Sequence, residues 1–348
     1  MLDSTIIRED VNSICNGISF GQLEGKTILV TGASGIVGTY FLECLHHLSA
    51  VHKMSLQVFA VMKNEPPAHL MECLSLPNFQ ILRGDLADSE LYPHLPETDF
   101  IIHAAGYGQP GAFLANPKAT IQLNTTATIA LLDKVKTGGK FLFISSSEVY
   151  SGLRNPPHKE TEIGLTNTDH TRSCYIESKR CGEAICNAYR ANGADAKSAR
   201  LCLAYGPGTR PGDHRALNSF IEKALKERHI RLLDAGHARR TYCYIADAVS
   251  IMWKILLEGK DSIYNVGGLS SITIAGLAQQ IGAILNVPVT LPEIINPLQG
   301  APEDVRLDLT KVEKEFGSLP YISLQVGLSR TIIWQSQLYN RPCKVLTQ

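Results

Sequence analysis

Short apolar runs alternate with amphipathic stretches along the chain from Lys26 onward. The runs are continuously apolar rather than alternating, which is typical of strands buried on both faces of a parallel sheet. A helical pattern at 39–48 follows the first run, as expected of a β-α-β unit. The pattern predicts an α/β fold built on a doubly wound parallel sheet. The predicted strands are 27–31, 57–62, 79–82, 100–103, 140–145 and 198–204.

This regular pattern loosens after about Tyr205. Gly206-Pro207-Gly208 and Pro211-Gly212 interrupt it there, which indicates a change in organisation. We predict a smaller, mixed α/β C-terminal lobe after this point. A strand and helix near 241–257 are expected to return to the first domain. The expected division is an N-terminal arm at 1–24 with a short helix within 4–18, a first domain at 25–205 with 241–260, and a discontinuous second lobe at 206–240 with 261–340.

Composition limits the partners of such a protein. The 348 residues are 44% hydrophobic, enough for a large core, and Lys+Arg and Asp+Glu both number 33. This balance gives no general attraction to nucleic acid or to an anionic membrane, so we predict neither as a partner. The 9 Cys residues show no paired metal-ligand spacing, and no long apolar run or signal peptide is visible. We therefore predict a cytoplasmic protein with free thiols and no metal site.

The first strand ends in a glycine-rich turn, and a helix follows. Gly32 permits the tight turn, Gly35 lets the backbone approach a pyrophosphate, and Gly38 lets helix and strand pack closely. The backbone at Ser34 and Ile36 completes a set of amides at the helix N-terminus. The motif predicts a dinucleotide site and makes the sheet Rossmann-type.

Residues after the later strands extend this predicted cofactor site. The second strand ends without the Asp or Glu that often binds the adenosine ribose of NAD, and Lys63 there could meet the 2′-phosphate of NADP. NAD is the expected cofactor, and NADP stays open. The remaining expected cofactor contacts are Asp85, Leu86, Ala104, Ala105 and Gly106, which follow the third and fourth strands.

Tyr175 and Lys179 are four residues apart, so they share one face of a helix. A neighbouring ammonium favours the phenolate and lowers the pKa of a tyrosine, which can turn the phenol into a base. Ser145-Ser146-Ser147-Glu148 ends the fifth strand about 25 residues earlier. We expect the two segments to meet over a nicotinamide.

Together these residues resemble the extended short-chain dehydrogenase/reductase family, specifically its nucleotide-sugar epimerases, dehydratases and decarboxylases. The resemblance runs from Lys26 to about Gln335. Further matching stretches are Asp99–Ala105, Asn116-Pro117, Asn124, Tyr205–Gly208, Arg240–Asp247 and Tyr264–Gly267.

The resemblance implies roles for three catalytic residues. Tyr175 takes the proton of a sugar 4-hydroxyl as hydride leaves for the cofactor, while Lys179 holds the cofactor ribose and lowers the tyrosine pKa. Ser146 completes the triad, with Ser145 and Ser147 as alternative registers. The first domain then binds the cofactor, and the second lobe binds the substrate.

Glu148 narrows the chemistry within this family. A carboxylate beside a 4-keto sugar can remove the acidic C5 proton, and a 4-keto acid can lose carbon dioxide. Ser147 stands where some dehydratases carry an acidic Asp, and it is also an expected substrate contact. Dehydration or decarboxylation is therefore the expected reaction. The alternatives are a 4-epimerase with Glu148 as a bystander, and a catalytically silent protein that senses a dinucleotide or binds a partner.

Arginines are the expected ligands of the substrate diphosphate, because guanidinium groups suit phosphate geometry. The candidates are Arg215, Arg240 and Arg306, of which Arg240 matches the family best. Leu203 departs from the pattern, since many relatives carry a substrate-contacting Asn there. Relatives usually dimerise through a bundle that includes the Tyr/Lys helix, so a homodimer is expected.

Overall fold

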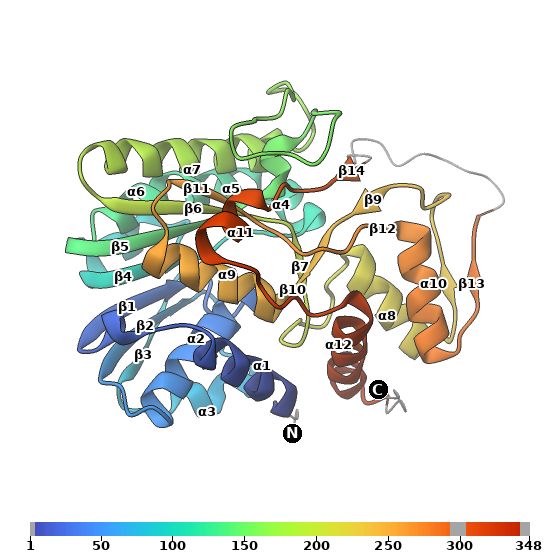
Figure 1. Cartoon of the computed structure of the whole chain (residues 1–348), viewed down its shortest axis with the longest axis horizontal. Helices are drawn as coiled ribbons and strands as arrows, with labels where there is room; N and C mark the ends of the chain where they lie inside the picture. The colour runs from blue at the N-terminus through green and yellow to red at the C-terminus, as the bar shows by residue number, and fades with distance from the viewer. Residues whose placement is uncertain (1–3, 293–303, 342–348) are drawn as a thin grey trace.

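A computed structural model describes residues 4–292 and 304–341 of the chain. Its centre is a seven-stranded parallel sheet in the order β11-β6-β5-β4-β1-β2-β3 (Figure 1), which is the Rossmann order extended by one strand at the β6 edge. The predicted α/β fold is thus confirmed. The strands are β1 (Lys26–Thr31), β2 (Leu56–Met62), β3 (Phe79–Arg83), β4 (Thr98–His103), β5 (Val135–Ser146), β6 (Asp195–Leu201) and β11 (Ile263–Val266).

Helices cover both faces of this sheet. One layer packs α1 (Thr5–Asn16) and α9 (Ile245–Glu258) around α2 (Ile36–Ala50), and the other holds α5 (Pro117–Asn124), α6 (Thr126–Leu132) and α7 (Ser173–Ala191). Successive residues of a strand point to opposite faces of the sheet and pack into two different cores. Ile28 and Val30 belong to one hydrophobic cluster, and Leu29 belongs to the other. This explains why the strands read as continuous apolar runs.

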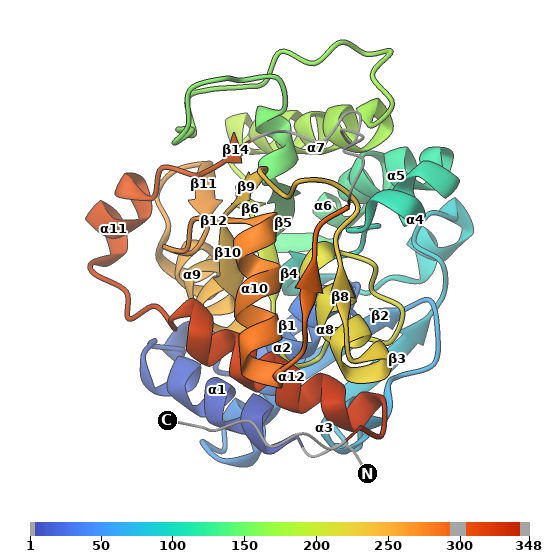
Figure 2. The ribbon, with the colours of Figure 1, turned by 90° about the vertical axis from the view of Figure 1, so that its right-hand side faces the viewer.

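The C-terminal lobe lies at the carboxyl end of the sheet, and turning the molecule shows its helices in front of the strands (Figure 2). Its helices are α8 (Ala216–Glu227), α10 (Ile274–Leu285) and α12 (Leu324–Leu338). Its short strands are β7 (Leu203–Tyr205) with β10 (Tyr242–Tyr244), β8 (Ile230–Arg231) with β13 (Val289–Thr290), and β9 (Arg239–Arg240) between β12 (Ile272–Thr273) and β14 (Asp304–Val305). The remaining helices are α3 (Met71–Leu74), α4 (Pro110–Ala115) and α11 (Thr310–Phe316), with short 3-10 turns η1 (Gly21–Leu23), η2 (Ala68–Leu70), η3 (Ser89–His94) and η4 (Ser147–Tyr150).

Two details of the predicted strands differ. The run predicted as one strand at 198–204 is two strands, β6 and β7, because the ladder between β6 and β11 ends where Cys202 N donates to Val266 O at 2.9 Å. β7 then pairs with β10, outside the main sheet. In addition, β11 pairs with β6, so 263–266 belong to the sheet rather than to the lobe in which the sequence placed them.

The N-terminal arm is an integral part of the fold. Ile7, Val11 and Ile14 recur at helical spacing and are buried in the core beside α2 and α9. Asp10 on the same helix is 3% exposed, and its carboxylate accepts hydrogen bonds from the hydroxyls of Tyr40 and Tyr244, each at 2.7 Å. An ion pair with Arg330 of α12 completes its partners.

Replacing Asp10 with Ala is expected to lower the free energy of unfolding by about 3 kcal/mol, because it leaves two buried hydroxyls and a guanidinium without their partner. Chemical denaturation of the full chain measures this. The matched control is Glu9→Ala: Glu9 also pairs with Arg330, at 3.4 Å, but its side chain is 58% exposed. The control should change stability by about 0.5 kcal/mol at most. Equal effects of the two variants would contradict the role of the buried carboxylate.

Candidate active site

The glycine turn lies at the carboxyl end of β1, where the neighbours on the two sides are β2 and β4 (Figure 1). Gly32 has a φ of +62°, and a Cβ there would lie 2.5 Å from Ala104 O. A Cβ on Gly38 would lie 2.4 Å from Gly32 O. Glycine is therefore required at both positions, and Gly35 ends the turn as the N-cap of α2. The turn brings the N-terminus of α2 to the switch point of the sheet, where dinucleotides bind in this fold.

The end of β4 is fixed against this turn by buried hydrogen bonds. His103 Nδ1 lies 2.7 Å from Thr31 Oγ1, and its Nε2 lies 2.8 Å from Leu123 O. Ala105 N donates to the same threonine hydroxyl at 3.2 Å. Burial lowers the pKa of His103 to about 3, so this residue is a neutral packing element. The small residues Ala104, Ala105 and Gly106 follow it at the carboxyl end of β4.

Ser146 and Tyr175 come together in the structure. Ser146 ends β5 and accepts a hydrogen bond from Glu148 N at 3.2 Å, while Tyr175 lies in the first turn of α7. Burial raises the pKa of Tyr175 above its ordinary value, and the hydrogen bond with Ser146 acts against this rise. The Tyr175 ring stacks on Phe113 of α4 with centroids 4.7 Å apart, which fixes the direction of its hydroxyl.

Lys179 lies one turn further along α7 and is 6% exposed. Its Nζ donates to Ile144 O at 2.6 Å and lies 4.7 Å from the centre of the Phe143 ring. Burial lowers the pKa of Lys179 to about 7. This differs from the sequence-based expectation of a full positive charge that lowers the tyrosine pKa. In the structure the cations that act in that direction are Arg172 and Arg215.

Glu148 is held beside this triad by an arginine that the sequence analysis missed. Arg172 Nη2 donates to Glu148 Oε1 at 2.6 Å, and its guanidinium lies over the Phe113 ring at 5.5 Å. Arg172 is the N-cap of α7 and lies three residues before Tyr175, but its contact with Glu148 depends on the fold of the loop before α7. Ser147 lies next to Glu148 and lines an enclosed cavity with it.

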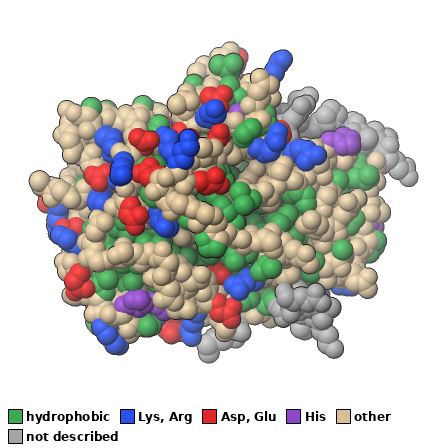
Figure 3. Space-filling view, in the orientation of Figure 1, with side chains coloured by type: hydrophobic (Ala, Val, Ile, Leu, Met, Phe, Trp, Pro, Cys, Tyr) green, Lys and Arg blue, Asp and Glu red, His purple; other side chains and the backbone are tan. Residues whose placement is uncertain are grey.

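The three predicted phosphate ligands lie at different distances from the triad. Arg215 forms an ion pair with Asp213, and its charge also acts to lower the pKa of Tyr175. Arg240 in β9 is close enough to Glu148 for the two charges to interact. Arg306 pairs with Asp304 at 3.0 Å on the far side of the cavity. On the face in Figure 3, Lys and Arg side chains gather near β9 and β14. A patch of positive charge thus borders the site.

Lys63 does not stand alone at the end of β2. Its Nζ pairs with Asp85 Oδ2 at 2.7 Å, and the Tyr107 hydroxyl is 3.5 Å away. Asp85 also accepts a hydrogen bond from Ala87 N at 3.0 Å, and Leu86 beside it is buried. The charge of the lysine that could meet a 2′-phosphate is therefore compensated by Asp85, an expected cofactor contact.

Comparison with known proteins places this site in a family. The model of the NAD dependent epimerase/dehydratase family matches residues 28–267, which include the glycine turn, the Ser146/Tyr175/Lys179 triad and Glu148. The chain belongs to this family. Members of the epimerase/dehydratase family are NAD-dependent enzymes, so the predicted resemblance and the predicted enzyme class are confirmed.

Curated relatives in the same family match most of the chain. It is 29% identical over 307 residues to UDP-glucuronic acid decarboxylase 5 of Arabidopsis thaliana, covering 86% of each chain. It is 27% identical over 317 residues to UDP-glucuronic acid decarboxylase 1 of Xenopus tropicalis, covering 89% of this chain and 72% of that protein.

Solved structures share the fold. A dTDP-glucose 4,6-dehydratase from Streptomyces venezuelae with NAD bound aligns with a TM-score of 0.78 at 23% identity, over 90% of this chain and 98% of that one. A UDP-glucuronic acid 4-epimerase from Bacillus cereus, in complex with UDP-glucuronic acid and NAD, aligns at 0.75 with 23% identity, over 90% and 100% of the two chains.

Lys179→Met is expected to stabilise the cofactor-free protein below pH 7, by at least about 1 kcal/mol, because it removes a buried charge. The folded-state pKa of Lys179, about 7, lies below the ordinary lysine value of 10.5, so the wild-type protein gains stability as pH rises between these values. The advantage of the variant should therefore shrink from pH 7 to pH 10. Denaturation at several pH values measures it, and a difference that does not change with pH would contradict the lowered pKa.

Proposed function

We propose that this protein is a nucleotide-sugar decarboxylase: it oxidises a nucleotide-linked uronic acid at C4, releases C6 as carbon dioxide and reduces C4 again. The observation that carries the proposal is the Glu148–Arg172 ion pair of 2.6 Å beside the triad. A guanidinium at the sugar end of the site suits a substrate with a carboxylate at C6. The curated relatives reported above are UDP-glucuronic acid decarboxylases, which supports the same choice.

The residues present fit a nicotinamide dinucleotide. Gly32, Gly35 and Gly38 would hold its pyrophosphate, and Lys179 would bind a ribose hydroxyl from its place beside Gly106, whose Cβ would lie 3.8 Å from Nζ. Asn124 Oδ1, near the same glycine, is buried without a partner among the described residues. NAD, when bound, accepts the C4 hydride and returns it.

The protein groups then have separate roles. Tyr175 takes the proton from the C4 hydroxyl, and Ser146 holds that oxygen through a hydrogen bond. Arg172 orients the C6 carboxylate with Glu148. Once C4 is a ketone, it can accept the electron pair of the C5–C6 bond. Carbon dioxide can then leave without a proton donor beside it. Arg215 and Arg240 bind the diphosphate, and Arg306 adds charge at the rim.

Dehydration fits the site less well. Loss of a C6 hydroxyl needs a proton donor next to it. The cavity is lined by two carboxyl groups, Glu148 and Asp304. Each is paired with an arginine, and Ser147 replaces the acidic Asp of some dehydratases. In a 4-epimerase, the Glu148–Arg172 ion pair would have no part in the reaction.

Incubation with NAD and a panel of nucleotide sugars should convert a nucleotide uronate to a product lighter by one carbon dioxide, as measured by mass spectrometry. Tyr175→Phe should lower turnover by a factor of at least about 10². Glu148→Gln should lower it by a similar factor while C4 oxidation, followed by absorbance of the reduced cofactor, continues. A product lighter by one water molecule would indicate dehydration instead, and a product of unchanged mass would indicate epimerisation. Full function of the Tyr175→Phe variant would indicate a catalytically silent protein.

NAD is the proposed cofactor rather than NADP. The Lys63–Asp85 ion pair compensates the lysine that would meet a 2′-phosphate, and Asp85 would repel that group. We expect NAD to bind at least about tenfold more tightly than NADP in calorimetric titration. Asp85→Asn should narrow the difference. Tighter binding of NADP by the wild-type protein would refute the assignment.

A second copy of the chain is the proposed partner. α5 and α7 pack together on one face of the sheet, and Ile121 of α5 and Ile129 of α6 are 44% and 42% exposed there. Leu114 of α4, at 47% exposure, extends this apolar surface. Light scattering of the full chain should give twice 38.0 kDa. Ile121→Lys should shift the mass toward the monomer, and a monomeric wild type would exclude the dimer.

The remaining assignments are the division of the chain and its compartment. We assign cofactor binding to the sheet domain, with β11 included, and substrate binding to the lobe formed by 206–240 and 267–340. No helix of the described residues is long and apolar enough to cross a membrane. The eight described cysteines are free thiols, which supports a cytoplasmic location. Fractionation of cells that produce the full chain tests that location.

A further inference from the structure

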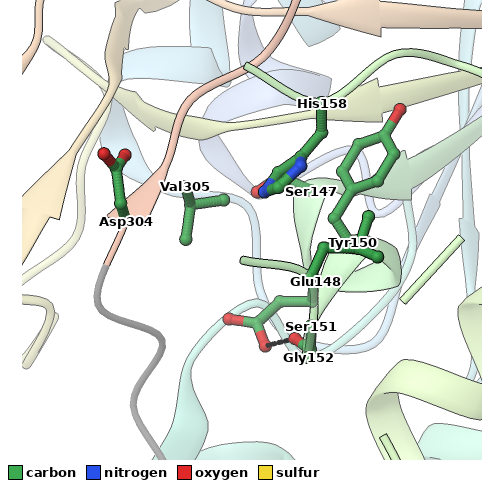
Figure 4. Close-up of a pocket in the computed structure, with 9 residues that line it drawn as sticks. Ser147, Glu148, Tyr150, Ser151, Gly152, His158, Asp304 and Val305 are labelled. Atoms are coloured by element: carbon green, nitrogen blue, oxygen red, sulfur yellow. Dashed lines mark hydrogen bonds between the residues drawn. The ribbon is translucent and has the colours of Figure 1, made fainter. Parts of the chain in front are cut away.

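A small cavity lies between the carboxyl end of β5 and the C-terminal lobe. Ser147, Glu148 and His158 line it on one side, and Asp304 and Val305 of β14 line it on the other (Figure 4). Its volume, counted as room for the centre of a water-sized sphere, is about 10 Å³. That is close to what one water molecule needs, and the polar side chains of the lining, among them Glu148 and His158, can hold a water by hydrogen bonds. The cavity thus adjoins the candidate catalytic residue Glu148.

Among the residues that line the cavity, His158 has a side chain with no role in the reaction steps proposed above. It is 2% exposed, and its Nδ1 is buried without a hydrogen-bond partner among the described residues. Its main chain is fully held: N donates to Arg306 O, and O accepts from Asp308 N and Asn265 Nδ2, all at 2.9 Å. An unpaired buried ring nitrogen costs about 1–3 kcal/mol, which is unusual in a segment so well bonded.

The ring is also held in one orientation. It stacks on Tyr150 with centroids 5.2 Å apart and an interplanar angle of 25°. Figure 4 shows it facing Ser147, with the Glu148 carboxylate on the other side of the cavity, where Ser151 donates to it at 3.4 Å. A fixed ring with an unpartnered Nδ1 at the wall of a cavity is suited to carry a proton.

The charges around this ring leave it neutral. Burial lowers the pKa of His158, Glu162 and Asp304 act to raise it, and Arg306 acts to lower it. Neutral imidazole carries one N–H donor and one acceptor nitrogen, so it can give a proton and take one. The two carboxyl groups of the cavity are both engaged with arginines.

We propose that His158 supplies the proton that C5 must receive after decarboxylation, through a water molecule in this cavity that Glu148 orients. This inference rests on the proposed function. When the C5–C6 bond breaks, its electron pair forms a C4–C5 enolate and carbon dioxide leaves. C5 then takes one proton from the water, and the water takes the N–H proton of the imidazole. The other ring nitrogen takes a proton from solvent in the same step, so that the ring stays neutral. The keto pentose that results is ready for reduction at C4.

His158→Phe and His158→Gln test this role, and His94→Gln, an exposed histidine of η3, is the matched control. In single-turnover experiments both His158 variants should form reduced cofactor within about threefold of the wild-type rate. Formation of the final pentose should fall by about 10²-fold in the variants. In D₂O the wild-type product should carry deuterium at C5. The pH profile of the slow step should lose an inflection below pH 6.5, and the control should match the wild type throughout.

The outcomes separate this role from its premise. A wild-type protein that makes no pentose from any nucleotide uronate would overturn the proposed function and this role with it. A wild-type protein that makes pentose, with His158→Phe equally fast, would overturn the role of His158 alone. Equal losses in cofactor reduction and pentose formation, in variants with wild-type thermal unfolding, would also overturn it, because they would assign the ring to packing around Tyr150.

Discussion

The buried ion pair between Arg200 and Glu183 is the constraint on which the site depends. Both residues are less than 5% exposed, and the guanidinium donates to the carboxylate through Nε and Nη2 at 2.8–3.2 Å. Glu183 accepts from Ser145 Oγ at 2.5 Å, and Arg200 Nη1 donates to the Tyr150 hydroxyl at 2.8 Å. The pair therefore joins β5, β6, α7 and η4 at one point. Removal of one partner from such a pair costs about 3–5 kcal/mol, so these elements keep a single arrangement.

The hydrogen bonds of this ion pair reach both groups of residues to which we assign proposed catalytic roles. Ser145 is next to the triad serine, and Glu183 is one turn beyond Lys179 on α7, so the first network fixes the groups for C4 oxidation. Arg200 Nη1 also donates to Glu160 O and Glu162 O, and Tyr150 donates to Asn265 Oδ1 at 2.7 Å. These bonds hold the loop that carries His158 against the sheet. One buried charge pair thus holds in place both groups of residues for which we propose proton-transfer roles.

The sequence predicted the parts of this molecule that local pattern determines. Buried strands have an apolar signature, and Gly32 and Gly38 are required by close backbone contacts, so the sheet and the cofactor turn could be read directly. Arg172 and His158 could not, because their roles depend on tertiary neighbours. The loop that ends at Arg172 must fold back before the guanidinium meets Glu148, and His158 reaches its cavity through a bridge to Leu307. Spacing along the chain shows that Lys179 neighbours Tyr175, whereas the burial that lowers the pKa of Lys179 depends on the fold.

The Asp10–Arg330 ion pair has a consequence for synthesis of the protein. Its partners are separated by 320 positions, and Arg330 lies on the last described helix. During translation the N-terminal helix is available early, but its buried carboxylate lacks its cation until α12 has left the ribosome. Docking of the first helix is therefore completed by the last one, and a truncated chain without α12 would retain an unsatisfied charge in its core. In this way the stability of the N-terminal helix depends on the synthesis of a segment 320 positions after Asp10.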